Sequence, residues 1–190
     1  MDSKHTRRKY THRIDKNGLI LSVSENWRSF SEENFGAESC FPENAVGSSL
    51  WEHIRDPETR HLYEIILQKV RLYQRQATFS FRCDSPAERR FLELSVIPMK
   101  DGTIEFESRI IRTELRKPVE LLKTDIKRSD NFIKICSMCK KIAISEMQWE
   151  EVEIAIQKLK LFDKDVLPQF THGVCRSCYD ATMAELDRLS

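Results

Sequence analysis

The sequence predicts an α+β fold, in which a five-stranded antiparallel sheet carries helices on one face and a small C-terminal four-cysteine module follows. The first observation behind this prediction is the order of the segments: two strands, several helices and then three strands. The second is a pair of short turns, Asn-Gly and Asp-Gly, of the kind that join neighbouring antiparallel strands. The third is a set of four cysteines in two close pairs near the C-terminus.

The composition is that of an ordinary globular protein. The chain has 190 residues, of which 40% are hydrophobic and 32% are charged, and its formal net charge is +1. A charge this small does not point to nucleic acid or to a membrane surface. No apolar run reaches the roughly 18 residues of a membrane span, and residues 1–9 form a polar tail without the apolar core of a signal peptide. We therefore expect a disordered tail at 1–9 and a cytoplasmic protein with reduced thiols.

The first predicted element is a β-hairpin. Residues 10–14 and 19–23 are its strands, and Asp15-Lys16-Asn17-Gly18 is the turn between them. The Asn-Gly pair suits such a turn because both residues tolerate positive φ.

Helices are predicted after the hairpin. A short helix contains Trp27 and Phe30, and residues 50–54 form a helical turn. A longer helix near 57–74 begins with Pro57, which fits the first turn of a helix. Its apolar residues recur at helical spacing. They are Leu62, Ile65, Ile66, Val70 and Tyr73.

Three strands complete the predicted sheet. They lie at about 76–83, 90–98 and 103–114, and apolar residues alternate with polar ones in the first two, as in half-buried strands. The segment Met99-Lys100-Asp101-Gly102 joins the last two strands as a second hairpin turn.

Several of these segments resemble PAS sensor domains, and one resembles a bacterial PAS-like subgroup. The resemblance covers about residues 10–115 and implies a PAS-like sensor domain at 10–117, with a five-stranded antiparallel sheet and helices on one face. The segments that carry it are 13–20 (the opening hairpin), 26–30 (the first helix), 46–51 (a Gly before a helical turn) and 82–86 with Arg89-Arg90 (the subgroup).

The cysteine pairs predict a structural zinc site. Cys136 and Cys139 form one C-x2-C pair, Cys175 and Cys178 form another, and about 35 residues separate the pairs. Four thiolates close the tetrahedron and leave no position for chemistry. Four reduced or disulfide-paired cysteines are the alternative, and His172 is an alternative fourth ligand. Three basic residues beside the ligands, Lys140, Lys141 and Arg176, can offset the charge of a four-thiolate zinc site.

The C-terminal segments resemble a cysteine-paired module that follows sensor domains in bacterial signalling proteins. The resemblance covers about 133–180 and implies a zinc-binding module at 133–190 that relays a signal to a protein partner. The segments that carry it are 135–141, Trp149 and 172–178. Within the module we predict helices at 149–156 and from 177 to about 189.

A linker helix is predicted at 118–132, between the two parts. Val119, Leu122 and Ile126 follow a coiled-coil spacing for little more than one heptad, which suggests a homodimer. The alternative is an ordinary linker helix that packs on its own chain.

Aromatic residues of the larger part are candidates for a small-molecule pocket, and the alternative is that they fill the core. The candidates are Trp27, Phe30, Phe35, Phe41, Trp51 and Tyr63. His53 and His61 are considered because some PAS oxygen sensors hold haem through a helix histidine. We do not favour haem, because a lone helical histidine is usually at the surface or satisfied in the core. The candidate ligand-binding residues are therefore Trp27, Phe30, Trp51, His61 and Tyr63.

Arginines cluster around Asp84 in the segment from Arg82 to Arg90. They could bind a phosphate, a carboxylate or an acidic partner. We favour the alternative, in which Asp84 pairs with an arginine and fixes the turn. Cys40 and Cys83 are single cysteines, which are usually buried as small hydrophobes.

These features favour a signal-sensing, regulatory protein without enzymatic activity. The sequence has no P-loop, nucleophile elbow or H-E-x-x-H motif. A nucleic-acid-binding regulator that uses the zinc module is the alternative, but residues 118–190 carry about as many acids as bases.

Overall fold

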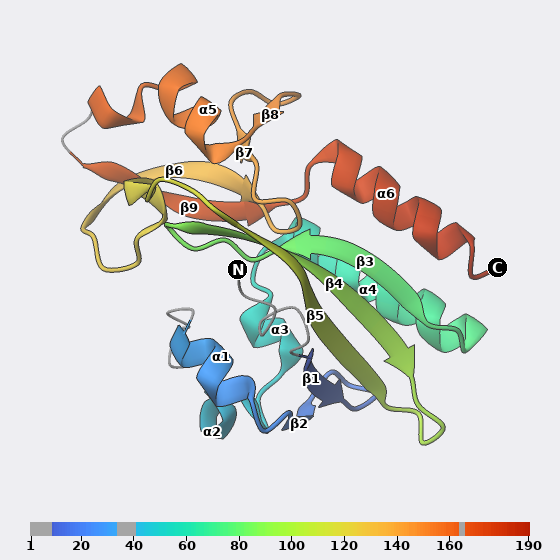
Figure 1. The fold of residues 1–190 in the computed structure, drawn as a ribbon. Helices are drawn as coiled ribbons and strands as arrows, with labels where there is room; N and C mark the ends of the chain where they lie inside the picture. The colour runs from blue at the N-terminus through green and yellow to red at the C-terminus, as the bar shows by residue number, and fades with distance from the viewer. Residues whose placement is uncertain (1–8, 34–40, 164–165) are drawn as a thin grey trace.

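The computed structural model describes residues 9–33, 41–163 and 166–190, and its larger part is a five-stranded sheet (Figure 1). The strand order is β2-β1-β5-β4-β3, and every neighbouring pair is antiparallel. This confirms the predicted antiparallel sheet. The strands are β1 (Lys9–Ile14), β2 (Ile20–Val23), β3 (Ala77–Arg82), β4 (Glu88–Pro98) and β5 (Ile104–Leu115).

The first hairpin turn forms at the predicted residues, with positive φ at Gly18 but not at Asn17. The Asp15 carboxylate accepts hydrogen bonds of 2.8 Å from the N–H groups of Asn17 and Leu19. Gly18 has a φ of +88°, and a Cβ at this position would lie 2.9 Å from Nε1 of Trp51. Glycine is therefore required both by the turn and by the close approach of the tryptophan.

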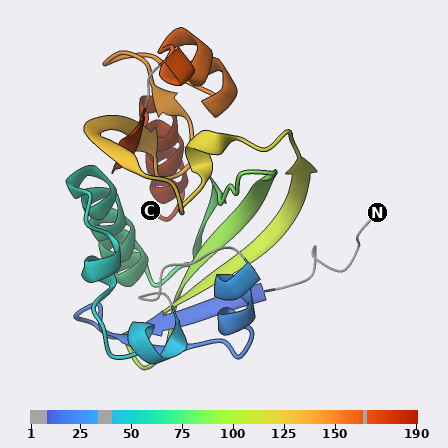
Figure 2. The same cartoon turned by 90° about the vertical axis from the view of Figure 1, so that its left-hand side faces the viewer.

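Helices cover one face of this sheet, as Figures 1 and 2 show for α4. Helix α4 begins after Asp56, whose side chain caps it by accepting a 2.7 Å hydrogen bond from the N–H of Thr59. Its buried residues, including Leu62 and Val70, pack against inward-facing sheet residues such as Phe106. The helices are α1 (Trp27–Glu33), α2 (Pro42–Ala45), α3 (Leu50–His53) and α4 (Pro57–Tyr73).

The C-terminal part contains a second sheet that the sequence analysis missed. Its order is β8-β7-β6-β9, with β6 and β9 parallel and the other pairs antiparallel. We call this sheet and its two helices the cysteine module. Its elements are β6 (Arg128–Cys136), β7 (Ile142–Ala143), β8 (Trp149–Glu150), α5 (Val152–Lys158), β9 (Leu167–Gly173) and α6 (Arg176–Asp187).

The predicted linker helix at 118–132 is wrong. The segment forms a single 3-10 turn, Glu120–Leu122, and β6 begins at Arg128. Arg128 donates hydrogen bonds of 2.8 and 2.7 Å to the carbonyl oxygens of Leu121 and Lys123, which holds the segment in an irregular path. Val119 is buried in the core of the cysteine module, so it does not contribute to a coiled-coil seam.

The other two predicted helices of this part are present, one of them shorter than predicted. Helix α6 occupies the predicted position, whereas the predicted helix at 149–156 starts only at Val152. Trp149 and Glu150 pair with β7 as a short strand instead. Pairing with β7 favours a strand here, and the local periodicity of the sequence does not reveal this pairing.

One hydrophobic cluster includes residues of both parts, and a second cluster lies within the cysteine module. Met138 and Leu186 of the cysteine module belong to the same buried cluster as Leu62 and Phe79 of the larger domain. Helix α6 lies beside α4, and the Lys69 ammonium is 3.2 Å from the Asp187 carboxylate. None of the helices in the described ranges combines the length and hydropathy of a membrane span.

Candidate metal centre

The first pair of cysteines lies in a tight turn at the end of β6. We call residues 136–141 the first ligand turn. The N–H of Lys140 donates to the carbonyl of Cys136 over 3.0 Å, and the N–H of Cys136 donates to the carbonyl of Lys141 over 2.8 Å. Lys140 has a φ of +62°, which lets the chain reverse direction directly after Cys139. Both sulfurs therefore face the same point.

The second pair follows β9, and we call residues 173–178 the second ligand turn. Strands β6 and β9 are parallel neighbours, with Cys136 opposite Gly173, so they end at the same edge of the sheet. The N–H of Ser137 donates to the carbonyl of Gly173 over 2.8 Å and ties the turns together. Cys175 then precedes α6, and Cys178 lies in its first turn.

The four sulfurs have the spacing of a tetrahedral metal site. All four Sγ atoms lie within 4.8 Å of one another, and those of Cys139 and Cys175 are 3.7 Å apart. A zinc ion with Zn–S bonds of about 2.3 Å separates its sulfurs by about 3.8 Å. A disulfide would need about 2.05 Å, and all four cysteines are free. The geometry therefore fits a four-thiolate metal site.

Hydrogen bonds within the cluster favour thiolates at its two most buried sulfurs. The Cys139 thiol lowers the pKa of Cys136 to about 6, and the N–H of Cys175 also donates to Cys136 Sγ over 3.4 Å. Hydrogen bonds from its neighbours, beginning with Cys136, lower the pKa of Cys175 as well. The same shared hydrogen bonds raise the pKa values of Cys139 and Cys178, so a cation must displace protons from these two thiols when it binds.

The other residues proposed near the metal lie outside the sulfur cluster. Lys140 stays beside the first ligand turn, because its ammonium donates to the carbonyl of Ser137 over 2.9 Å. Arg176 is exposed and pairs instead with Asp180 at 2.9 Å. His172 is an exposed residue of β9 and is not among the residues whose ligand atoms cluster.

The aromatic candidates of the larger domain do not line one common pocket. Trp27 and Phe30 of α1 are half-buried against the sheet, where the ring of Phe30 is 4.3 Å from that of Tyr10. Tyr63 belongs to α4, its ring is 6.3 Å from that of Phe106 in the sheet, and burial raises its pKa to about 12. Phe41 is half-buried beneath Arg28, whereas Phe35 and Cys40 lie outside the described residues.

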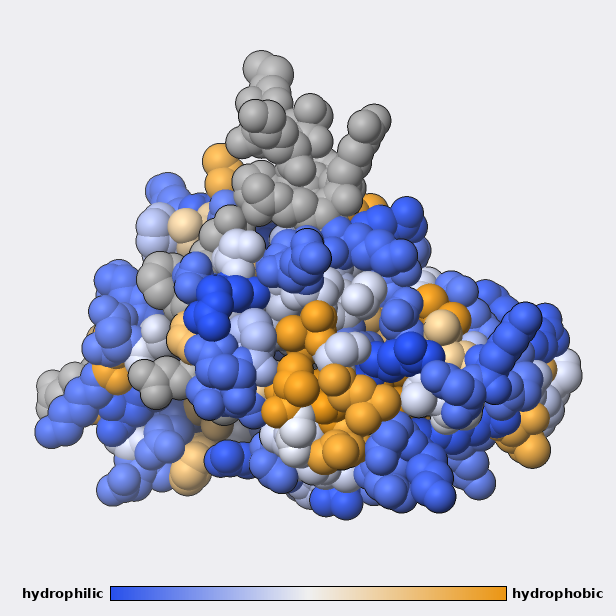
Figure 3. All heavy atoms as spheres, turned by 90° about the horizontal axis from the view of Figure 1, so that it is seen from below, coloured by the Kyte–Doolittle hydropathy of each residue, from blue (hydrophilic) through white to orange (hydrophobic). Residues whose placement is uncertain are grey.

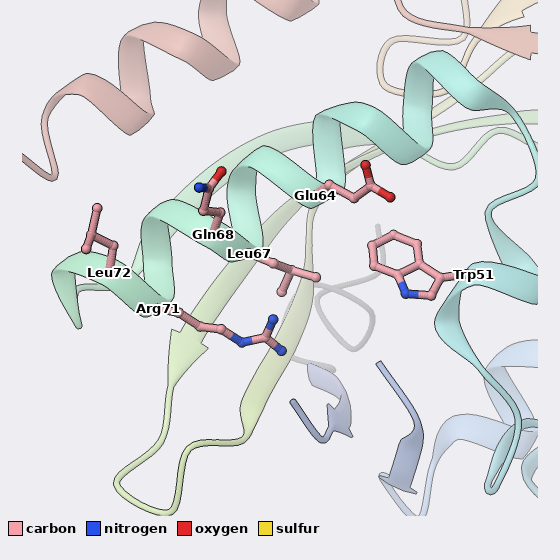
Figure 4. Close-up of a pocket in the computed structure, with 6 residues that line it drawn as sticks. All are labelled: Trp51, Glu64, Leu67, Gln68, Arg71 and Leu72. Atoms are coloured by element: carbon pink, nitrogen blue, oxygen red, sulfur yellow. The ribbon is translucent and has the colours of Figure 1, made fainter. Parts of the chain in front are cut away.

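Trp51 lines a groove of about 490 Å³ along α4 (Figure 4). The guanidinium of Arg60 lies 5.1 Å from the centre of its ring. Arg71 extends into the same groove, and its Nη2 donates to the carbonyl of Asp15 over 3.1 Å. The other residues of the groove are Glu64, Leu67, Gln68 and Leu72.

The two candidate histidines are both exposed. His61 lies on a different side of α4 from Trp51 and lines a groove of about 610 Å³ between this helix and the cysteine module. Met147, Trp149 and Tyr179 line the same groove. His53 hydrogen-bonds through Nε2 with the hydroxyl of Ser48 at 2.8 Å.

His12 is a half-buried residue among aromatic rings that the sequence analysis did not single out. Its ring stacks on Phe106 at 4.5 Å and meets the ring of Trp27 at 5.4 Å. Burial lowers its pKa to about 4, and nearby His53 adds to this effect. The strand alternation of residues 10–14 places this side chain on the inner face, which was the available signal.

The arginine cluster meets carboxylates of its own chain. Arg82 donates to Asp84 through Nε over 3.1 Å and to both oxygens of Glu151 over 3.0 and 2.8 Å. Arg116 lies 3.3 Å from Asp84, and Arg89 lies 2.7 Å from Glu153. Asp84 thus pairs with arginines at the turn, as in the alternative favoured from the sequence. The other carboxylates that these arginines meet are Glu151 and Glu153 of the cysteine module. Arg90 instead donates to the carbonyl of Cys83, a half-buried thiol.

Comparison with solved structures finds sensory domains that are similar to part of the chain. A domain of an HTR-like protein from Haloarcula marismortui is 19% identical with a TM-score of 0.38, and it matches 55% of this chain and 98% of its own. A sensory box sensor histidine kinase from Vibrio cholerae is 13% identical with a TM-score of 0.41, over 56% of this chain and 85% of its own.

The photoactive yellow protein domain of the sensor histidine kinase Ppr from Rhodospirillum centenum is 16% identical with a TM-score of 0.37, over 56% of this chain and 96% of its own. These scores are below 0.5, so the assignment of the fold rests on the sheet topology described above. No protein-family model matches the sequence, and no curated protein matches it significantly.

Proposed function

We propose that this chain is a cytoplasmic signal-sensing protein without catalytic activity. Its PAS-like larger domain receives a signal, and its cysteine module, stabilised by zinc, passes the signal to a protein partner. The residues that would hold the zinc ion are Cys136, Cys139, Cys175 and Cys178.

The single observation that carries this proposal is the closed sulfur cluster inside a core shared by both parts. Four sulfurs occupy all positions of a tetrahedral ion, which makes the metal structural. Cys136 and Cys175 are buried among residues of the larger domain, so a change there can reach the cysteine module.

Two features support a small-molecule signal. The groove at Trp51 offers an aromatic ring and, further along α4, the Arg71 guanidinium (Figure 4). The aromatic cluster at Trp27 packs between α1 and the sheet, and aromatic side chains line many small-molecule sites. Haem is not part of the proposal, because the exposed His61 lies away from this cluster.

The proposal does not include nucleic acid as a partner. The arginines that could contact phosphates, Arg82, Arg89 and Arg116, already face carboxylates. A paired guanidinium has less charge to offer a backbone phosphate.

A homodimer through the larger domain is also proposed. A hydrophobic patch faces the viewer in Figure 3, which looks from below at the side where β2 and α2 lie. Three apolar side chains in or next to β2 and α2 are exposed: Leu19 to 40%, and Leu21 and Val46 to 43% each. Sedimentation should detect dimers at tens of micromolar protein, about the range where weak association becomes measurable. A monomer at that concentration would remove the dimer from the proposal.

Purification from the native host tests the proposed function. The wild-type chain should retain a protein partner, and Cys175→Ser should lose it because the cysteine module loosens without its metal. Cys83→Ser is the matched control, since Cys83 lies away from the sulfur cluster. Recovery of nucleic acid instead of protein, or a specific turnover reaction, would overturn the proposal.

A further inference from the structure

Both ligand turns contact the same end of α4. The first ligand turn reaches Thr59, since the hydroxyl oxygens of Ser137 and Thr59 lie 2.7 Å apart. The second reaches the preceding residue, because the N–H of Val174 donates to the Glu58 carboxylate over 3.1 Å. Consecutive residues in one helical turn therefore hold the two halves of the sulfur cluster.

The contact at Glu58 depends on a close approach. Its other carboxylate oxygen accepts a 2.8 Å hydrogen bond from the ammonium of Lys134, on β6. A Cβ at Gly173 would lie 2.7 Å from Glu58 Oε2 and 2.8 Å from Lys134 Cδ. Glycine at this position therefore leaves room for the Glu58 carboxylate and the Lys134 side chain beside the second ligand turn.

The interface at Thr59 leaves little room for independent movement. Thr59 is only 6% exposed, and its N–H is held by the capping Asp56. Met138, beside Cys139, is buried, and its carbonyl accepts a 2.7 Å hydrogen bond from the N–H of Arg82. Packed interiors transmit a displacement because they contain few voids that could absorb it.

We propose that the first turn of α4 is the regulatory contact of the metal centre, so that the position of α4 and the affinity for zinc are thermodynamically linked. This inference rests on the proposed function and names the path between its sensing domain and its zinc site. A ligand that moves α4 would change metal affinity, and metal removal would by reciprocity change α4. The path consists of direct contacts and does not need the segment 118–127.

The affinity of the full chain for zinc, measured by competition with a chromophoric chelator, tests this link. Thr59→Val removes one hydroxyl at nearly constant volume, and we expect it to weaken zinc binding by about tenfold, within the usual range of coupling between sites. Thr59→Ser keeps the hydroxyl and should restore the affinity to within about twofold of the wild type. Thr78→Val is the matched control, because the Thr78 hydroxyl bonds to Ser95 in the sheet.

Hydrogen exchange of the wild-type chain provides a second readout that does not depend on a variant. Removal of zinc by the chelator should speed exchange at residues 58–62 by about tenfold, and by clearly more than at residues 104–110 in the sheet, which do not contact the ligand turns directly. Two results would overturn the linkage alone: a zinc affinity of Thr59→Val equal to that of the wild type, or unchanged exchange at residues 58–62. A wild-type chain that binds no zinc would overturn the proposed metal site and the linkage with it.

Discussion

At the residue scale, single side chains fix positions that the strand and helix patterns leave open. Gly18 is the clearest case, because its backbone needs positive φ and the Trp51 ring lies against it. Gly47 has nearly the same φ, +87°, but a Cβ there would contact nothing within 4 Å. Gly47→Ala should therefore cost only the backbone strain, about 1–2 kcal/mol. Gly18→Ala should cost at least about 1 kcal/mol more by urea denaturation, because the ring must also move. Equal costs would show that the ring does not constrain this turn.

Asp84 lies at the centre of the ionic contact between the two parts. Its side chain is 2% exposed and faces both Arg82 and Arg116. Asp84→Asn should destabilise the chain by about 1–3 kcal/mol, because it removes the buried carboxylate that both guanidinium groups share and leaves them only Glu151 and Glu153. Glu93→Gln breaks the exposed pair with Arg109 and should cost less than about 1 kcal/mol. Similar losses in both variants would contradict a buried network.

His12 should make stability depend on pH. Its folded-state pKa of about 4 lies below the ordinary value of 6.5, because burial disfavours the charged ring. The neutral ring is therefore compatible with the folded state above about pH 6.5, and stability is lost as the pH falls from 6.5 toward 4, when the unfolded chain takes up the proton. Urea denaturation at pH 7 and pH 5 should show a loss of about 1–2 kcal/mol for this residue, and His12→Phe should remove that part of the loss. If the stability of His12→Phe depends on pH as that of the wild type does, other groups cause the loss of stability.

At the scale of elements, two substitutions in the segment between the two parts test whether it packs on its own chain or forms a coiled-coil seam. Leu121 is 0% exposed in the core of the cysteine module, whereas Ile126 is only half-buried. Leu121→Ala should therefore cost about 2–5 kcal/mol of unfolding free energy, and Ile126→Ala should cost about 1 kcal/mol or less. The coiled-coil interpretation predicts the opposite order, since Ile126 lies on its seam and Leu121 does not.

Elements with strong local signals could be predicted from the sequence, and elements that depend on distant partners could not. The hairpin turns at Gly18 and Gly102 and the capped helix α4 carry their own signals. Strands β6 and β9 pair across a long connection, so only the folded chain shows why residues 128–136 are extended. The same limit applies to the metal centre. Spacing predicts four cysteines at one site, but not that Glu58 and Thr59 of α4 hold both ligand turns.

At the scale of the whole molecule, the sulfur cluster belongs to the main core. Cys136 and Cys175 are buried in the cluster that also contains Leu62, Ile66 and Phe79. Metal binding to such a site contributes directly to folding, because the site does not exist in the unfolded chain. Loss of the metal should therefore lower the stability of the larger domain as well as that of the cysteine module.

The most direct measurement is the metal content of the purified full chain, read together with its thermal unfolding. The account predicts one zinc ion per chain, held by the four cysteines. Cys136→Ser should lose the metal and unfold at a lower temperature, whereas Cys83→Ser should keep both properties of the wild type. A purified wild-type chain that contains no metal, removal of the metal without a change in unfolding temperature, or full zinc occupancy in the variant with all four ligand cysteines replaced by serine would contradict the account.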